Sequence, residues 1–252
     1  MMKKLRRFKK QVYKMIDKEV LLQEKRRYEL PLFISKKEEK LLKKDYPVQK
    51  IIGYQTMQNV HIDIRYNVLI PRYETEEVII ETYNYINENS NVLDLCCGSG
   101  FIGLAINKNK KCNVTLSDIS RSAIKQTKLN IKINNLENCE VIKSNLFNKI
   151  TKKYDLIVSN PPYLNKKNKF SKSLKWEPKK ALYAKQKGLF FYKKILSEAK
   201  KYLNKNGYLV LEIDEFSKKW IEENYKNAIF KKDINKKFRI AILEYNDLVL
   251  KK

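Results

Sequence analysis

Apolar residues follow two different spacings along this chain, and the change from one to the other divides it into parts. Over residues 1–45 they recur at helical spacing, at Leu5, Phe8, Val12, Met15 and Ile16 and then at Val20, Leu21 and Leu22. Pro31 interrupts this pattern, and the segment from Ser35 to Glu38 has the form of a capping box that opens a further short helix. We therefore expect residues 1–45 to form a small, basic helical lobe.

Residues 46–72 change to a strand pattern. The segment His61–Tyr66 alternates polar and apolar side chains, and Val68–Ile70 follows after one asparagine, which predicts a short β-hairpin that links two lobes. Thr75 is a plausible N-cap for the helix that follows, because acidic residues occupy the next two positions and favour a helix start.

From residue 91 onward, strands alternate with helices, a pattern typical of a sheet covered by helices. Five apolar runs predict the strands of this sheet, at residues 92–95, 114–118, 140–143, 156–159 and 208–213. Residues 230–234 and 239–245 predict a closing antiparallel pair, and a helix over 190–202 is expected to stop at Asn206-Gly207. The fold class is therefore α/β, with a helix-covered sheet over residues 73–252.

Length and charge set bounds without deciding the function. The chain has 252 residues and a mass of 30.1 kDa, enough for one sizeable α/β domain and a smaller appendage. Its net charge of +26 favours nucleic acid, ribosomal or acidic protein partners. Lysine is spread over almost every segment, however, as an AT-rich genome would produce, so the charge by itself does not identify a partner.

The cysteines and the single histidine argue against metal or disulfide chemistry. Cys96, Cys97, Cys112 and Cys139 form no C-x-x-C pair, and His61 is the only histidine, so no zinc spacing occurs and no metal site is expected. Free cysteines fit a reducing compartment, and we expect a cytoplasmic monomer. No apolar run reaches the length of a membrane span, and the basic N-terminus lacks the apolar segment of a secretory signal.

The first strand ends in a glycine-containing loop, Asp94-Leu95-Cys96-Cys97-Gly98-Ser99-Gly100. Glycines let a ligand approach the backbone closely, and the helix that follows supplies free N–H groups. Gly103 lies at the offset of a dinucleotide fingerprint, which keeps nicotinamide binding as an alternative. Asp94 favours a cofactor with a cationic or amine head instead. Asp118 ends the next strand, where a carboxylate can accept both hydroxyls of a ribose.

The most distinctive stretch is Ser159-Asn160-Pro161-Pro162-Tyr163, which follows the apolar run Tyr154–Val158. Two prolines end the sheet ladder and make the chain rigid there. That rigid segment presents a carboxamide, two backbone carbonyls and an aromatic ring at the carboxyl end of a strand, the edge at which open α/β sheets bind ligands.

Taken together, the loop, Asp118 and the Asn-Pro-Pro-Tyr stretch resemble the Rossmann-like S-adenosylmethionine-dependent methyltransferases. The resemblance implies that the cofactor is S-adenosylmethionine and that Leu146 or Phe147 contacts its adenine. The other cofactor-binding residues that it implies are Asp94, Cys96, Cys97, Gly98, Ser99, Gly100, Asp118 and Asn160.

Asn-Pro-Pro-Tyr further suggests methylation of a planar nitrogen, with Asn160, Pro161 and Tyr163 as the catalytic residues. The Asn160 side-chain oxygen and the Pro161 carbonyl would accept the two N–H groups of the substrate, and Tyr163 would stack on the planar group. Pro162 would complete the substrate pocket. Rate would come from positioning and electrostatics, without a strong base.

Bases of nucleic acids and glutamine side chains of proteins are both substrates of enzymes with this signature. The stretches at residues 47–53, 69–76, 176–182 and 188–192 are similar to the HemK-type release-factor N5-glutamine methyltransferases. That family resemblance implies methylation of the glutamine in the Gly-Gly-Gln loop of peptide-chain release factors. A nucleic-acid base methyltransferase and a ribosomal-protein glutamine methyltransferase remain alternatives. Arg72 either contacts the substrate or structures the hairpin junction.

Overall fold

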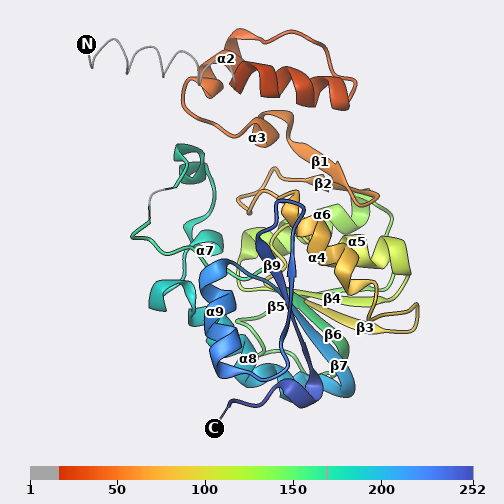
Figure 1. The fold of residues 1–252 in the computed structure, drawn as a ribbon. Coiled ribbons are helices and arrows are strands. Elements are labelled where there is room, and N and C mark those ends of the chain that lie inside the picture. Colours follow the sequence, from red (N-terminus) through yellow and green to blue (C-terminus); the bar gives the residue numbers. More distant parts are fainter. Residues whose placement is uncertain (1–16, 169, 252) are drawn as a thin grey trace.

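The computed structural model describes residues 17–168 and 170–251 and contains a seven-stranded sheet with a small helical lobe above it (Figure 1). The N-terminal helical prediction that rests on residues 1–16 lies outside the described residues. The order of strands along the sheet is β5-β4-β3-β6-β7-β9-β8. Its members are β3 (Asn91–Leu95), β4 (Asn113–Asp118), β5 (Cys139–Lys143), β6 (Tyr154–Ser159), β7 (Leu203–Glu212), β8 (Ile229–Lys232) and β9 (Phe238–Glu244).

The predicted sheet of strands that alternate with helices and its closing antiparallel pair are both confirmed. The strands β3, β4, β5, β6 and β7 are parallel, and β9 is antiparallel to both β7 and β8. The order reverses next to β3, and in parallel sheets ligands bind outside the strand ends at such a switch point.

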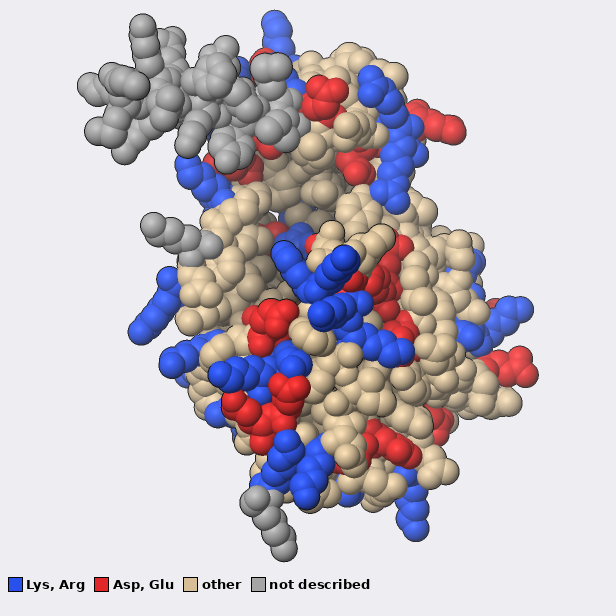
Figure 2. All heavy atoms as spheres, viewed as in Figure 1, with Lys and Arg blue, Asp and Glu red and all other residues tan. Residues whose placement is uncertain are grey.

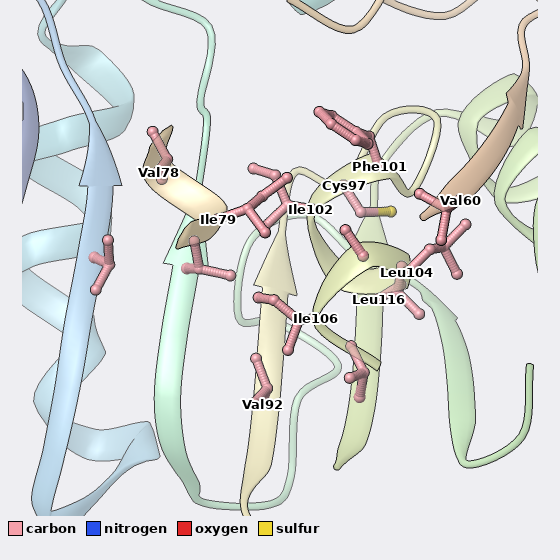
Figure 3. Close-up of a cluster of buried hydrophobic side chains, with 14 of the residues drawn as sticks. Val60, Val78, Ile79, Val92, Cys97, Phe101, Ile102, Leu104, Ile106 and Leu116 are labelled. Carbon is pink, nitrogen blue, oxygen red and sulfur yellow. The ribbon is translucent and has the colours of Figure 1, made fainter. Parts of the chain in front are cut away.

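Helices cover both faces of the sheet because successive side chains of each buried strand point to opposite faces. Val92 and Val158 point toward the face covered by α4 (Glu74–Thr82), α5 (Phe101–Lys110) and α6 (Arg121–Ile133), where they belong to one hydrophobic cluster (Figure 3). Leu93 and Ile157 point to the other face, where a second cluster includes side chains of α8 (Phe190–Glu198) and α9 (Glu215–Asn224).

The linking hairpin lies earlier in the chain than the sequence predicted. Its strands are β1 (Tyr54–Met57) and β2 (Val60–Asp63), and Val68–Ile70 forms no strand. The reason is the turn at Gln58-Asn59, where both residues have positive φ, the geometry of the tight turns that match the twist of two paired strands. The alternating segment at residue 61 is thus the second strand of the hairpin.

The N-terminal lobe has a small core of its own. Residues 17–27 are helical, and the helices α2 (Lys36–Leu42) and α3 (Val48–Ile52) follow. Leu21, Leu42 and Val48 form its buried cluster, and the capping box predicted at Ser35 is present. The limits of the lobes stay a prediction, and the packing of Val48 favours a limit after α3.

Two further element predictions are corrected. Thr75 is not an N-cap, because α4 begins one residue earlier, at Glu74, and Tyr73 in the N-cap position forms no side-chain cap. Asn206-Gly207 does not end a helix but lies inside β7, after a helical segment that already ends as a 3-10 turn, Ala199–Tyr202. The sequence prediction assigned Asn206-Gly207 to a helix end because glycine often terminates helices, whereas the pair lies within a strand.

Basic side chains are scattered over the visible face of the molecule, with acidic ones between them (Figure 2). In the part of the chain that the structure describes, no helix is long and apolar enough to cross a membrane.

Candidate active site

The loop after β3 turns sharply before α5. Cys96, Gly98 and Gly100 all have positive φ, and Cys96 is the residue for which this conformation is costly. A Cβ at Gly100 would lie 3.1 Å from side-chain atoms of Leu104 and Thr127, so this position also needs glycine for space. The loop is therefore held in one strained, tightly packed shape at the carboxyl edge of the sheet.

Asp118 fastens that loop to the end of the neighbouring strand. Its carboxylate accepts the backbone N–H groups of Gly98 at 3.0 Å and of Ser120 at 2.7 Å. Burial raises the pKa of Asp118 above its ordinary value, although these backbone hydrogen bonds oppose the shift. The loop and the carboxylate thus form one unit, as the sequence predicted from their places at successive strand ends.

A cavity of about 450 Å³ opens beside this unit. It brings together residues from the loop, from the ends of β4 and β6, and from the segments around residues 72 and 180. The predicted site residues that line it are Arg72, Cys96, Cys97, Gly98, Ser99, Asp118, Leu146, Asn160 and Pro162. A backbone cradle, a carboxylate beside it and a largely apolar wall fit a nucleoside with a charged sulfonium group.

Asp94 lies behind the loop and does not line the cavity. Its side chain is completely buried, and its Oδ2 accepts the backbone N–H of Gly103 at 2.9 Å. Its Oδ1 has no hydrogen-bond partner among the described residues, and burial raises the pKa of Asp94 to about 7. The direct cofactor contact predicted for it is therefore not found, because the alternation along β3 turns this side chain toward α5.

Both cysteines of the loop line the wall of the cavity. Burial is the main cause that raises the pKa of both the Cys96 and the Cys97 thiol, and the nearby carboxylates raise it further. A thiol that stays protonated is a poor nucleophile, in agreement with the interpretation of both residues as small side chains of a tight turn.

The Asn-Pro-Pro-Tyr segment begins where β6 ends. Asn160 lines the cavity, and its Nδ2 donates to Glu212 Oε2 at 2.8 Å and to Thr75 Oγ1 at 3.4 Å. Pro162 lines the cavity as well, but Pro161 and Tyr163 do not. The Tyr163 ring instead packs against the hydrophobic cluster on the α8 side, where burial raises the pKa of its hydroxyl. Its predicted stacking position is thus not the one observed.

Arg72 structures the hairpin junction, and its contact with a substrate stays a prediction. Its guanidinium is paired with Glu177 at 2.6 Å, and the same carboxylate accepts the backbone N–H of Ile70 at 2.9 Å. This pair ties the segment after the hairpin to the segment before α7 (Lys179–Leu182). Arg72 also lines the cavity, so a residue that holds the junction together is available to a ligand.

Sequence reasoning missed Thr75 as a site residue, and it missed Glu177 and Glu212 as well. Glu212 had a usable signal, since it is an acidic residue within the apolar run of β7. Thr75 had none, because only the docking of α4 on the sheet brings its hydroxyl to the strand ends.

The comparisons agree with this geometry. Residues 74–178 match the family model described as "Methyltransferase small domain". A release factor glutamine methyltransferase of Borreliella burgdorferi is 37% identical over 85% of this chain and 81% of its own length. The chain belongs to the release factor glutamine methyltransferase family. It is accordingly a methyltransferase that uses S-adenosylmethionine, and the nicotinamide alternative is excluded.

The alignments with two other relatives cover a smaller share of the relative's own length. A release factor glutamine methyltransferase of Streptococcus pneumoniae is 41% identical over 66% of this chain, which spans 61% of that protein. A ribosomal protein uL3 glutamine methyltransferase of Francisella tularensis is 39% identical over 66% of this chain and 56% of its own length.

Solved structures are similar in fold alone. A methyltransferase from Pyrococcus furiosus has a TM-score of 0.57 at 18% identity and covers 78% of this chain and 93% of its own. A 16S rRNA N2 G1207 methyltransferase of T. Thermophilus in complex with AdoMet and guanosine has a TM-score of 0.54 at 14% identity, with 76% and 49% covered.

Proposed function

We propose that this protein transfers a methyl group from S-adenosylmethionine to the side-chain amide nitrogen of a glutamine in peptide-chain release factors, within their Gly-Gly-Gln loop. The observation that carries the proposal is the position of Asn160, a carboxamide on a rigid segment at the wall of the cavity beside the glycine loop. Family membership supports the substrate, because relatives at 37% and 41% identity are named release factor glutamine methyltransferases.

Binding of the cofactor is assigned to the loop. Gly98 and Ser99 line the cavity and would let the cofactor approach the backbone closely, and Asp118 offers a carboxylate for the ribose hydroxyls. Leu146 lies at the same cavity wall and would pack on the adenine. When bound, S-adenosylmethionine supplies an electrophilic methyl group on a sulfonium.

The residues of the chain position the acceptor nitrogen. An amide nitrogen is a weak nucleophile because its lone pair is delocalised, so orientation matters more than proton removal. The Asn160 Oδ1 would accept one of its N–H groups at the cavity wall, where Pro162 would provide the apolar contact. The Pro161 carbonyl is the proposed acceptor of the other N–H group and would have to turn toward the cavity, which Pro161 does not line. This arrangement acts through positioning and fixed dipoles, which contribute most when water is excluded.

A ribosomal protein is an alternative substrate for the same pocket. The uL3-directed relative indicates that a ribosomal protein is the second candidate substrate, since it would use the same pocket and differ in the surface that docks.

We propose a cytoplasmic monomer, and the support for the compartment is that Cys96, Cys97, Cys112 and Cys139 are all free. Light scattering of the purified chain tests the oligomeric state.

A labelled methyl-transfer assay tests the substrate. Release factor, ribosomal protein uL3 and total RNA are offered separately with labelled S-adenosylmethionine. Label on the release factor is expected, and its loss when the glutamine of the Gly-Gly-Gln loop is replaced identifies the atom. Asn160→Ala should lower kcat by about 10²- to 10³-fold. The exposed Asn89, replaced in the same way, is the control and should leave kcat unchanged. Label confined to RNA would contradict the proposal.

A further inference from the structure

A buried acid stands directly behind the carboxamide of Asn160. Glu212 is the last residue of β7 and is 2% exposed. Ser159 and Leu211 are partners in the parallel register of β6 and β7, so Asn160 and Glu212 are the next pair along the two strands. Alternation along β7 turns Glu212 toward the face that α4 covers, whereas Leu211 points to the opposite face. The acid is thus held by the sheet itself.

Two polar groups from separate elements meet at one oxygen of this acid. Glu212 Oε2 accepts the Asn160 Nδ2 at 2.8 Å and the Thr75 hydroxyl at 2.7 Å. Thr75 Oγ1 lies 3.4 Å from the same Asn160 nitrogen. Because the Thr75 proton is given to Glu212, the Thr75 oxygen faces Asn160 as an acceptor. Both groups that face Asn160 Nδ2 therefore accept hydrogen bonds.

This polarity fixes which way the Asn160 carboxamide faces. An asparagine has a donating end and an accepting end of nearly equal size, and packing alone distinguishes them poorly. Glu212 Oε2 already accepts the Thr75 hydroxyl, so it faces Asn160 as an acceptor that binds Nδ2 and rejects Oδ1. The accepting end is then the one left for a ligand in the cavity that Asn160 lines. An acceptor is what the N–H groups of a substrate amide need.

Burial of an acid in this position costs folding free energy, so a role beyond packing is needed to explain it. Burial raises the pKa of Glu212. The hydrogen bond from Thr75 is the main effect that opposes this shift, and the charges of nearby arginines oppose it as well. A glutamine would fit the same space without the cost of burying a charge. Stability alone therefore does not account for the acid.

We propose that Glu212 is a positioning residue that, together with Thr75, orients the Asn160 carboxamide with its oxygen toward the substrate amide. The proposal rests on the proposed function, since it assigns a task to the same pocket. Glu212 touches neither substrate nor cofactor in this scheme and acts through Asn160.

The test is Glu212→Gln, which keeps the size of the side chain but can either donate or accept. The Asn160 carboxamide then loses its single orientation. We expect kcat to fall by about 10- to 100-fold, with the Kd for S-adenosylmethionine within twofold of wild type by calorimetry and thermal stability equal or higher. A purely structural role would lower stability and cofactor affinity together with kcat.

The matched control is Glu81→Gln, the same change at another buried acid. Glu81 lies on α4, pairs with Lys231 at 2.7 Å and does not line the cavity. It should leave kcat unchanged.

A second pair of variants keeps the proposal testable if Glu212→Gln does not fold. Thr75→Val removes the hydroxyl and should lower kcat about tenfold or less, and Thr75→Ser should restore most of it. Wild-type kcat in Glu212→Gln, or equal loss in Thr75→Val and Thr75→Ser, would overturn the inference. A wild-type enzyme that does not methylate release factor would instead contradict the proposed function.

Discussion

Gly188 is the position at which a single methyl group should disturb the catalytic segment from a distance. Its φ is +104°, and a Cβ built there would lie 2.3 Å from the backbone carbonyl oxygen of Tyr163. Real Cβ contacts essentially never fall under 3.0 Å, so one of the two backbones must move by at least 0.7 Å. Leu164 cannot simply swing away, since its N–H donates to the Leu182 carbonyl at 2.8 Å. The displacement is therefore expected to reach the Asn-Pro-Pro-Tyr segment.

Two separable costs follow for Gly188→Ala. An alanine at positive φ costs about 1–2 kcal/mol of unfolding free energy, independent of any contact. The shift of the catalytic segment by nearly 1 Å should lower kcat by up to about 10²-fold, because the substrate amide is then held out of line.

Gly53→Ala is the matched control for this prediction. Gly53 has a φ of +96°, so it pays the same backbone cost, but a Cβ there meets nothing within 4 Å. Chemical denaturation and steady-state methyl transfer are measured for both variants. Both should lose about 1–2 kcal/mol, and only Gly188→Ala should lose kcat. Equal kcat values in the two variants would show that the Tyr163 contact does not govern the site, and our reasoning would be wrong.

Two further changes test the buried charges. Asp94→Asn removes an acid whose pKa in the folded protein is raised from 3.8 to about 7. The stability of the wild type should therefore fall relative to that of the variant as pH rises from about 4 to 7, by up to about 4 kcal/mol. Chemical denaturation across this pH range measures the difference, and a difference that does not change with pH refutes the prediction. Glu177→Gln breaks the ion pair with Arg72, whose own side chain is 35% exposed, and should cost about 1–2 kcal/mol and raise the KM for the protein substrate. An unchanged KM beside a lowered kcat would place Glu177 at the chemistry instead.

The strands of the sheet could be predicted from the sequence because each buried strand is a short apolar run with a clear boundary. The strands at residues 92–95 and 114–118 lie inside the observed β3 and β4, and the closing antiparallel pair is also present. The loop, Asp118 and Asn160 converge as expected, since parallel strands bring their carboxyl ends to one edge. Boundaries set by local turn chemistry were less predictable, as the hairpin at Gln58-Asn59 demonstrates.

The direction of side chains and the partners of buried polar groups required the tertiary structure. Asp94 and Tyr163 occur at the predicted places in the chain, yet neither lines the cavity, because strand alternation and packing on the α8 side decide where they point. Thr75 meets Glu212 over a separation of 137 residues, which no local pattern encodes. The sequence alone determined the fold class and the segments that form the site. Only the tertiary structure decided which groups face the ligand, because orientation depends on contacts between distant elements.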